Sequence, residues 1–236
     1  MAALYSVATR AVPTGRTRSF LIVSVMVACI LIPEWARGGS KARVLDKVRA
    51  FYGKAREISA CFEQTARSKF DPGASTKVKG CLYIRRPDKF RWEYDDPESG
   101  PLLVWDGKDL YQYDSVDETV EVIRGFGSNN LTVALSFLFG KGDIRSEFAV
   151  ESASEPKQGR VKVVLRPKKK PSRFKELVLV VDADTGEVEE TSWTDSYGGE
   201  NRLVFKGFKL NPGLEDDKFR FVIPKGVDVI EQGTPR

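Results

Sequence analysis

The side chains that carry most acid–base and nucleophilic chemistry are largely missing from this sequence. The chain has 236 residues and contains no histidine. This excludes Ser-His-Asp and Cys-His catalysis, histidine-ligated zinc sites and imidazole-based pH switching. Neither a phosphate-binding glycine-rich loop nor a Gly-x-Ser-x-Gly elbow occurs. We therefore expect no enzyme activity, no metal site and no cofactor.

Two carboxylate clusters could do chemistry, and both are better explained as turns. Asp95, Asp96 and Glu98 surround Pro97, which favours a solvated turn over a glycosidase-like pair. Residues 182–187 resemble a calcium loop, but glycine falls at the fifth position and no glutamate occupies the twelfth. A tight hairpin turn is the favoured interpretation there. A hydrolase that uses carboxylates alone is the weakest alternative.

The N-terminal residues predict export. Basic residues precede a mostly apolar run at 20–32, which is too short to cross a bilayer as a helix. We expect residues 1–38 to be a cleaved signal peptide and residues 39–236 to form a single exported domain. Lipid attachment at Cys29 is the alternative. Without residues 1–38 the chain has 34 basic and 32 acidic residues, a net charge of +2. This small net charge argues against nucleic-acid binding.

Two cysteines, Cys61 and Cys81, remain in the predicted mature chain. An even pair in an exported protein favours a single disulfide. Each cysteine lies in a strand-like stretch, so the bridge would join two strands. Two buried free thiols are the alternative.

The hydrophobic pattern predicts one helix followed by many short strands. Apolar residues recur at helical spacing from Val44 to Ala55, so residues 40–57 are expected to form a helix with Ser40 as its N-cap. From Ile58 the period changes to two, and the short connections favour an antiparallel meander. The predicted strands are 58–66, 78–86, 89–95, 101–106, 109–114, 118–124, 145–152, 160–166, 174–182, 187–197, 201–209 and 219–223.

A second, amphipathic helix is predicted between two of these strands. Gly140 ends it, and Phe126 precedes it between two glycines, where it looks exposed. The helix could therefore be a hinged lid, although an ordinary core-facing helix is the simpler interpretation. Its apolar positions are Leu131, Ala134, Leu135, Leu138 and Phe139.

The segment from Gly80 to Tyr94 has an unusual aromatic face. Phe90, Trp92 and Tyr94 alternate with charged residues, so one face of the strand is wholly aromatic. The preceding strand presents Leu82, Ile84 and Arg86. This face is either half of a sandwich core or the apolar inner wall of a curved sheet beneath a lid.

Five motifs occur in order along the chain: Phe62-Glu-Gln64; Gly80-x-Leu-x-Ile-x-Arg-Pro-x-x-Phe-x-Trp92; the Pro97 turn; Asp106-Gly-x-x-Leu-Tyr-x-Tyr113; and Phe219-x-Phe221 with Pro224-x-Gly226-Val227. Together they resemble the periplasmic outer-membrane lipoprotein carrier family of the LolA type. The resemblance implies a mainly β fold with some α: an incomplete antiparallel β-barrel, a curved sheet of about 11 strands. Helices would form a lid over its hydrophobic cavity.

The resemblance also implies a function. Such a chaperone binds the acyl chains of lipoproteins released from the inner membrane and delivers them to an outer-membrane acceptor. Its partners would be triacylated lipoproteins, an inner-membrane ABC-type lipoprotein-releasing complex and an outer-membrane lipoprotein acceptor, and the carrier would be a monomer. A lipid- or lipoprotein-sensing signalling module of the same fold is the alternative.

Particular residues acquire roles from the same resemblance. Arg86 would be the arginine that latches the closed lid, and Phe90 an aromatic in the cavity wall. The Cys61–Cys81 pair lies outside the family pattern. The residues expected to line the acyl-chain cavity are Phe62, Leu82, Ile84, Phe90, Trp92, Tyr94, Leu131, Leu135, Leu138 and Phe139.

Overall fold

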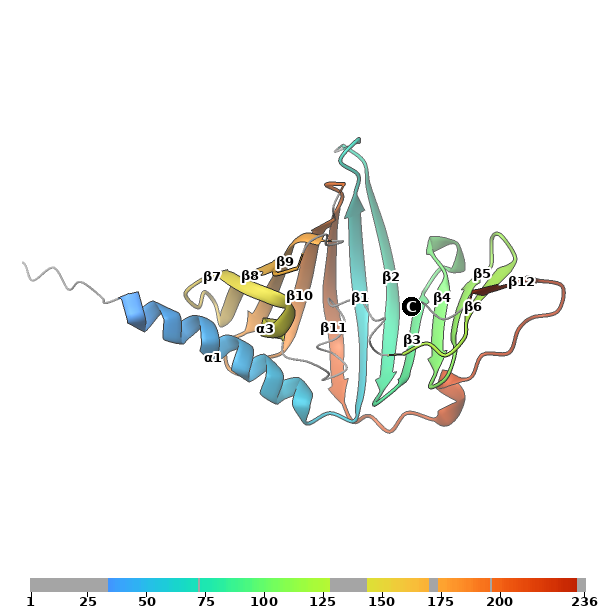
Figure 1. Cartoon of the computed structure of the whole chain (residues 1–236), viewed down its shortest axis with the longest axis horizontal. Coiled ribbons are helices and arrows are strands. Elements are labelled where there is room, and N and C mark those ends of the chain that lie inside the picture. The colour runs from blue at the N-terminus through green and yellow to red at the C-terminus, as the bar shows by residue number, and fades with distance from the viewer. Residues whose placement is uncertain (1–33, 72, 128–143, 170–173, 196, 233–236) are drawn as a thin grey trace, which may run out of the picture. The chain divides into compact units, whose positions relative to one another are not determined.

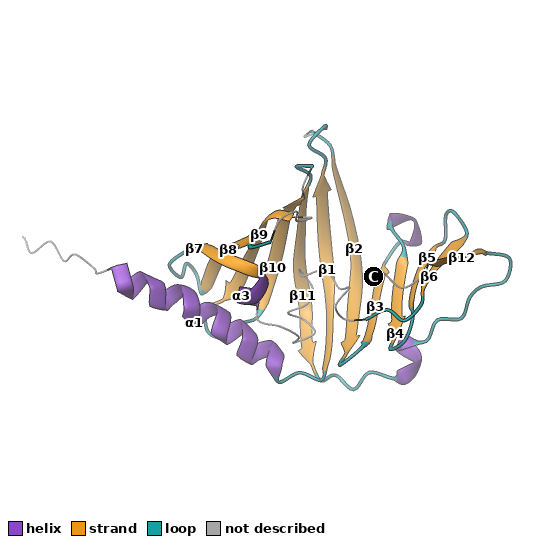
Figure 2. Cartoon of the chain, in the orientation of Figure 1, coloured by secondary structure: helices purple, strands orange, loops and turns teal. Residues whose placement is uncertain are grey.

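The computed structural model describes residues 34–71, 73–127, 144–169, 174–195 and 197–232, which belong to one compact unit beginning at Glu34. The described part is built mainly from strands, with few helices (Figure 2). The helices are α1 (Glu34–Gly53), η1 (Pro97–Ser99), α3 (Ile144–Glu147) and η3 (Asp216–Phe219). The strands are β1 (Glu57–Arg67), β2 (Ser75–Arg85), β3 (Lys89–Tyr94), β4 (Leu102–Asp106), β5 (Leu110–Asp114), β6 (Thr119–Ile123), β7 (Phe148–Ala153), β8 (Arg160–Pro167), β9 (Phe174–Asp182), β10 (Val188–Asp195), β11 (Glu200–Leu210) and β12 (Asp228–Gln232).

The strands form one open, curved sheet in the order β12-β6-β5-β4-β3-β2-β1-β11-β10-β9-β8-β7 (Figure 1). β12 and β7 are its two edges and do not pair with each other, so the barrel is incomplete, as predicted. Eleven predicted strands match β1 to β11 within a few residues, although Ile144–Glu147 is helical where a strand was expected to begin. The expected strand at 219–223 is wrong, because the last strand is β12.

β12 also departs from the antiparallel prediction. It pairs with β6 in parallel, in the register Asp228↔Thr119 to Gln232↔Ile123. A parallel pair needs a crossover instead of a hairpin, and residues 211–227, here called the C-terminal strap, provide it. Figure 1 shows the strap running past the lower ends of β1 to β4 before it returns to β12.

Helix α1 supplies an apolar stripe to the core. Val44, Leu45, Val48 and Tyr52 are buried against the face of the sheet that carries the main hydrophobic cluster, here called the inner face. The helix begins at Glu34 and ends at Gly53, so the expected span of 40–57 with Ser40 as N-cap is wrong. Among the described residues, no helix is long and apolar enough to cross a membrane.

The β9–β10 turn docks α1 onto the sheet. Asp182 Oδ1 accepts hydrogen bonds from the backbone N–H groups of Asp184 (3.0 Å) and Thr185 (2.7 Å), so residues 182–187 are the predicted hairpin turn. Gly186 has φ +84°, and a Cβ there would lie 2.4 Å from the Lys47 carbonyl oxygen. Only glycine lets the turn approach the helix this closely. The Tyr52 hydroxyl accepts from the Val188 N–H (3.1 Å), and burial raises the pKa of Tyr52.

The C-terminal strap is held at the start of β1 by a network around Glu57. Glu57 Oε2 accepts from the N–H groups of Gly213 and Leu214, at 2.8 Å each. Arg85 bridges Glu57 Oε1 (2.8 Å) to Asp216 and to the Leu214 carbonyl. Burial opposes ionisation of Glu57, but the strap N–H groups and the Arg85 guanidinium outweigh it and lower the pKa of that carboxyl.

This network predicts an acid-sensitive strap. A carboxyl whose pKa is lowered by folding stabilises the fold at pH above its unfolded-state pKa, and that contribution is lost as pH falls through the folded-state pKa. The melting temperature of the wild type is therefore expected to fall more steeply between about pH 7 and pH 3 than that of Glu57→Gln, which cannot ionise. Asp217→Asn, at an exposed position of the same strap, is the control. Parallel curves for the wild type and Glu57→Gln would contradict the assignment.

Cys61 and Cys81 form a disulfide between the two central strands. They are directly opposite each other in the β1–β2 ladder. Their side chains point away from the inner face, because the buried neighbours Ala60, Phe62 and Leu82 alternate with them. The bridge therefore fastens the middle of the sheet from outside and leaves the inner face unchanged.

Removing this bridge should destabilise the fold. The cysteines are 20 residues apart, and closing a loop of that size in the unfolded chain corresponds to about 3 kcal/mol. Cys61→Ser/Cys81→Ser should then melt roughly 6–12 °C below the oxidised wild type. Reductant should lower the wild-type melting temperature similarly and leave the variant unchanged. Equal melting temperatures for the oxidised wild type and the variant would show that the bridge contributes nothing.

Candidate functional site

An aromatic cluster occupies the inner face at the centre of the sheet. Phe62 and Trp92 have ring centroids 4.1 Å apart, and Tyr94 meets Phe62 edge-on at 5.8 Å. Phe90 continues the row 6.5 Å from Trp92. Strands β1, β2 and β3 bring these rings together with Leu82 and Ile84, which pair with Trp92 and Phe90. The six positions predicted in these strands thus share one face.

Gly80 makes the close packing of these rings possible. It lies opposite Phe62 on β1 and Tyr94 on β3. A Cβ at Gly80 would lie 2.7 Å from Phe62 Cζ and 2.2 Å from the Glu93 carbonyl oxygen. The Phe62 ring occupies the space above this glycine, which explains why the second motif begins with glycine.

A polar chain borders the aromatic cluster. Tyr94 Oη donates to Gln64 Oε1 (3.2 Å), and Gln64 Nε2 donates to Asn201 Oδ1 (3.3 Å). Burial raises the pKa of Tyr94, so its hydroxyl stays protonated and able to donate. The Phe62-Glu-Gln64 motif therefore supplies both an aromatic and an amide to the inner face. No sequence pattern indicated this role for Asn201, because only the register of β1 against β11 brings it to Gln64.

Two neighbouring arginines at the end of β2 have different environments. Arg85 faces outward and holds the strap, through Glu57 and Asp216. Arg86 follows the last residue of β2, and its N–H donates to the Arg56 carbonyl (2.9 Å). Its side chain is half-buried, and desolvation lowers the pKa of its guanidinium. The two adjacent cations therefore offer a matched pair for mutation.

The inner face also contains one residue whose environment was wrongly predicted from the sequence. Phe126 was expected to be exposed between its glycines, but it is only 9% exposed. Its ring meets Trp105 edge-on at 5.2 Å. The adjoining Gly125 N–H and the Arg124 guanidinium donate to Asp109, at 2.9 and 2.8 Å. These hydrogen bonds fix the backbone directly after β6 and thereby place Phe126 in the core.

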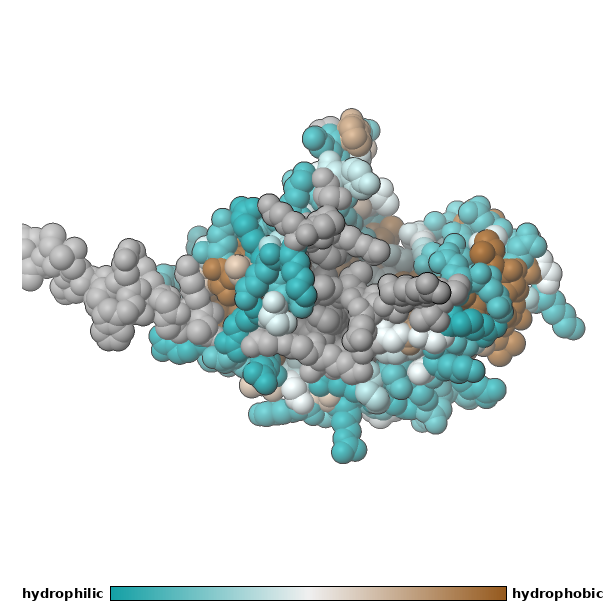
Figure 3. Space-filling view, in the orientation of Figure 1, coloured by the Kyte–Doolittle hydropathy of each residue, from teal (hydrophilic) through white to brown (hydrophobic). Residues whose placement is uncertain are grey.

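The tyrosines of the fourth motif lie on the outer face. Tyr111 and Tyr113 contact Phe221 of the strap with tilted rings, at ring centroid distances of 5.3 and 5.9 Å. Phe219 of the strap is buried, and Arg85 lies 5.2 Å from its ring centroid. The late aromatic motif thus covers the outer face and forms no strand. Figure 3 shows apolar residues gathered near β5, β6 and β12.

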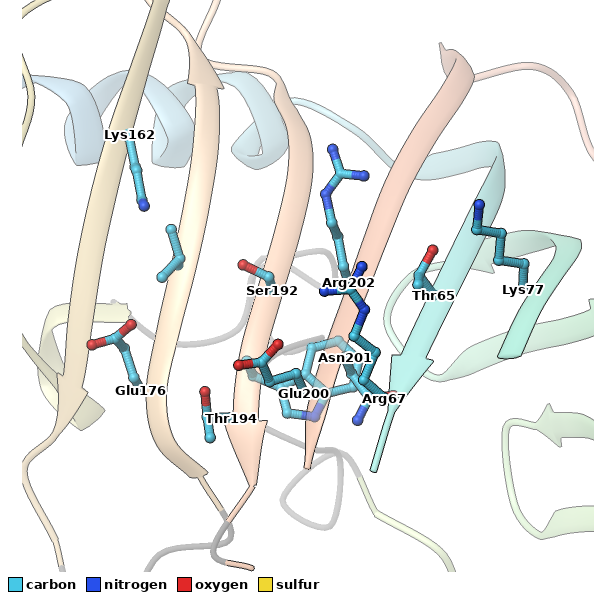
Figure 4. Close-up of a pocket in the computed structure, with 12 residues that line it drawn as sticks. Thr65, Arg67, Lys77, Lys162, Glu176, Ser192, Thr194, Glu200, Asn201 and Arg202 are labelled. Atoms are coloured by element: carbon cyan, nitrogen blue, oxygen red, sulfur yellow. The ribbon is translucent and has the colours of Figure 1, made fainter. Parts of the chain in front are cut away.

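A groove of about 470 Å³ on the outer face is polar and does not suit acyl chains. Figure 4 shows its side chains, which come from β1, β2 and β8 to β11. Arg202 in this groove already forms a bidentate pair with Glu190, at 2.7 and 2.5 Å. The charged residues around it are Arg67, Lys77, Lys162, Glu176, Glu200 and Arg202.

The remaining predicted cavity residues belong to the expected lid helix. Leu131, Leu135, Leu138 and Phe139 lie outside the described residues. The acidic residues of the Pro97 turn, Asp95, Asp96 and Glu98, are exposed as predicted for a solvated loop.

An open, curved sheet with an aromatic inner face is a half-barrel, and the comparisons place it in a family. The family model described as outer membrane lipoprotein carrier protein LolA matches residues 53–222, so this chain belongs to that family. The outer-membrane lipoprotein carrier protein of Chromobacterium violaceum is 32% identical, over 87% of this chain and 96% of its own. That of Cupriavidus necator is also 32% identical, over 91% and 100%.

A solved structure supports the fold. An uncharacterized conserved protein from Thermus thermophilus superimposes with a TM-score of 0.51 at 16% identity, covering 82% of this chain and 99% of that one. This likeness concerns the arrangement of the strands alone.

Proposed function

We propose that this protein is a periplasmic carrier of lipoproteins, and that it shelters their acyl chains against the inner face of the half-barrel. The observation that carries the proposal is the continuous apolar surface formed by Phe62, Leu82, Ile84, Phe90 and Trp92 in a chain of the lipoprotein carrier family. Tyr94 adds its ring at the border of this surface.

The energetics of transfer explain why a carrier is needed. Each methylene moved into water costs about 0.8 kcal/mol, so the tens of methylenes of a triacylated lipoprotein cost on the order of 30 kcal/mol. No protein complex binds more tightly than about −20 kcal/mol, and a carrier must also release its cargo. Partial shielding with moderate affinity therefore fits the task better than full enclosure.

Loading requires a conformational change. The inner-face side chains of the cluster are buried, so an acyl chain reaches them only after a segment that shields them moves away. Arg86 stands at the end of β2 with a half-buried guanidinium, which needs hydrogen-bond acceptors to offset its desolvation. In this proposal Arg86 latches the closed state, and the helix expected at 131–139 is the lid.

The wider pathway follows from the same proposal. Residues 1–38 would be removed as a signal peptide, and residues 39–236 would act as a monomer. An ABC-type complex of the inner membrane would load the carrier, and an acceptor at the outer membrane would take the lipoprotein by binding it more tightly. The chain uses no nucleotide in this scheme.

The test is direct cargo binding. The secreted protein is incubated with a triacylated lipoprotein in detergent, the detergent is removed, and the soluble fraction is separated by size. A soluble complex of one carrier and one lipoprotein is expected, together with its absence for the same lipoprotein stripped of its acyl chains. Precipitation of the acylated lipoprotein in the presence of the carrier would refute the proposed function.

A further inference from the structure

Three polar residues of the inner face lie on three adjacent strands. Gln64 on β1 pairs with Leu203 on β11, which pairs with Thr191 on β10. Asn201 lies two residues from Leu203 on the same face and accepts from Gln64. Gln64, Thr191 and Asn201 therefore form a polar group, here called the polar subsite, beside an otherwise apolar surface.

Thr191 is the least satisfied member of this group. Its side chain is only 1% exposed, and within the described part of the chain its hydroxyl has no hydrogen-bond partner. A buried hydroxyl without a partner costs about 1–3 kcal/mol. Its neighbours across the ladders are Leu203 and Leu179, so an apolar side chain would suit the position better. The hydroxyl therefore points to a partner that is not part of the described chain.

A groove opens next to the polar subsite. It has a volume of about 480 Å³ and lies between the tips of the β1–β2 and β10–β11 hairpins, with Asn201 in its lining. The two tips touch, because a Cβ at Gly198 would lie 2.8 Å from Lys69 Cδ. Phe70 and Tyr197 stand at the tips, 87% and 79% exposed. We call this the tip groove; Figure 1 shows the β1–β2 hairpin projecting beyond its neighbours.

We propose that the polar subsite binds the ester and amide carbonyls that join the acyl chains to the lipoprotein, and that the following peptide leaves through the tip groove. This inference rests on the proposed function. The acyl chains would lie toward Leu82, Ile84 and Phe90, at the apolar end of the inner face.

The chemistry of the two surfaces matches the two parts of such a ligand. A hydroxyl and carboxamide N–H groups donate to carbonyl oxygens, and they do so most effectively where water is excluded. A peptide that leaves through the tip groove meets mixed polar side chains, including Ser68, Thr76 and Asp195, and the flanking aromatics. Neither the polar subsite nor the tip groove is suited to the hydrocarbon of the acyl chains.

Two ligands separate the roles in binding experiments. One is a synthetic triacylated lipopeptide, and the other is an alkyl-pyrene probe, which has hydrocarbon but no carbonyl. Thr191→Val and Asn201→Leu should each weaken lipopeptide binding about tenfold, the equivalent of one lost hydrogen bond in a dry site, and leave probe binding unchanged. Thr65→Val, on the outer face of β1, is the matched control and should change neither.

Stability gives a second, independent readout. Thr191→Val removes an unsatisfied hydroxyl from the unliganded protein and replaces it with a methyl group of similar size. The variant should therefore melt at the same temperature as the wild type or higher, while binding lipopeptide less well. A lower melting temperature would show that the hydroxyl is already satisfied and would overturn the assignment.

The outcomes distinguish the inference from the function it rests on. Equal weakening of lipopeptide and probe, or no change in either, would overturn the polar subsite and leave the carrier function standing. Binding of neither ligand by the wild type would refute the function itself. A photo-crosslinker at Phe70 should label the peptide of a bound lipoprotein, and labelling of acyl chains there would reverse the proposed orientation.

Discussion

Replacing Phe90 by glutamate is expected to abolish cargo loading. Phe90 is buried on the inner face beside Trp92, opposite Ile84. A carboxylate there must be desolvated among apolar side chains whenever an acyl chain binds, which costs several kcal/mol. Cargo affinity should fall at least about 100-fold. The measurement is the yield of soluble lipoprotein complex from purified carrier.

Two controls separate loss of binding from loss of folding. Phe90→Leu keeps the surface apolar and should retain most loading. Val164→Glu places the same charge on the outer face between Lys162 and Arg166, and it should load normally. Because burial raises the pKa of a carboxyl, loading by Phe90→Glu should partly recover at mildly acidic pH. Wild-type occupancy at neutral pH would remove Phe90 from the binding surface.

Replacing Arg86 by leucine is expected to leave loading intact and impair delivery. The proposed latch stabilises the closed state, so cargo must break its hydrogen bonds to bind, and that cost favours release. Leucine removes the cost, so the carrier should keep its cargo and hand it over at least about tenfold more slowly to an acceptor. The assay follows transfer of lipoprotein from the loaded carrier to acceptor-bearing membranes.

Arg85→Leu is the matched control for this result. It removes a neighbouring guanidinium that serves the strap through Glu57 and Asp216. It should lower the melting temperature and leave the transfer rate of the folded carrier unchanged. If both variants lowered transfer equally, the effect would come from lost positive charge. Normal transfer by Arg86→Leu would refute the latch.

The strands were predictable where one face of the sheet is buried. In β3, the buried Phe90 and Trp92 alternate with half-buried charged residues, which is the period-two pattern of a half-buried strand. β12 gave no such pattern, because all five of its residues are exposed. Its position depends on parallel pairing with β6, about a hundred residues away in the sequence, and no local pattern predicts such a pairing. The alternation of Phe219 and Phe221 predicted a strand instead, although the strap uses these rings to cover the outer face.

The site was predictable only in part. The spacing of Phe90, Trp92 and Tyr94 placed them on one face, and the Phe62 motif added the fourth ring. Thr191 and Asn201 are ordinary polar residues of strands, and only the registers of β10, β11 and β1 bring them to Gln64. Phe126 was wrongly predicted to be exposed because glycines flank it. In the structure, hydrogen bonds from Gly125 and Arg124 to Asp109 direct its ring into the core. Long-range register and tertiary hydrogen bonds decide these positions.

The parallel pairing of β12 with β6 affects how the polypeptide can mature. β6 precedes its partner by about a hundred residues in the sequence, so this border of the sheet stays unpaired until the residues of β12 have docked. Unpaired edge strands can pair with other polypeptides, and contacts between residues so distant in the sequence form slowly. β12 itself remains an edge strand after it docks, so fusion tags are better attached elsewhere than directly beyond it.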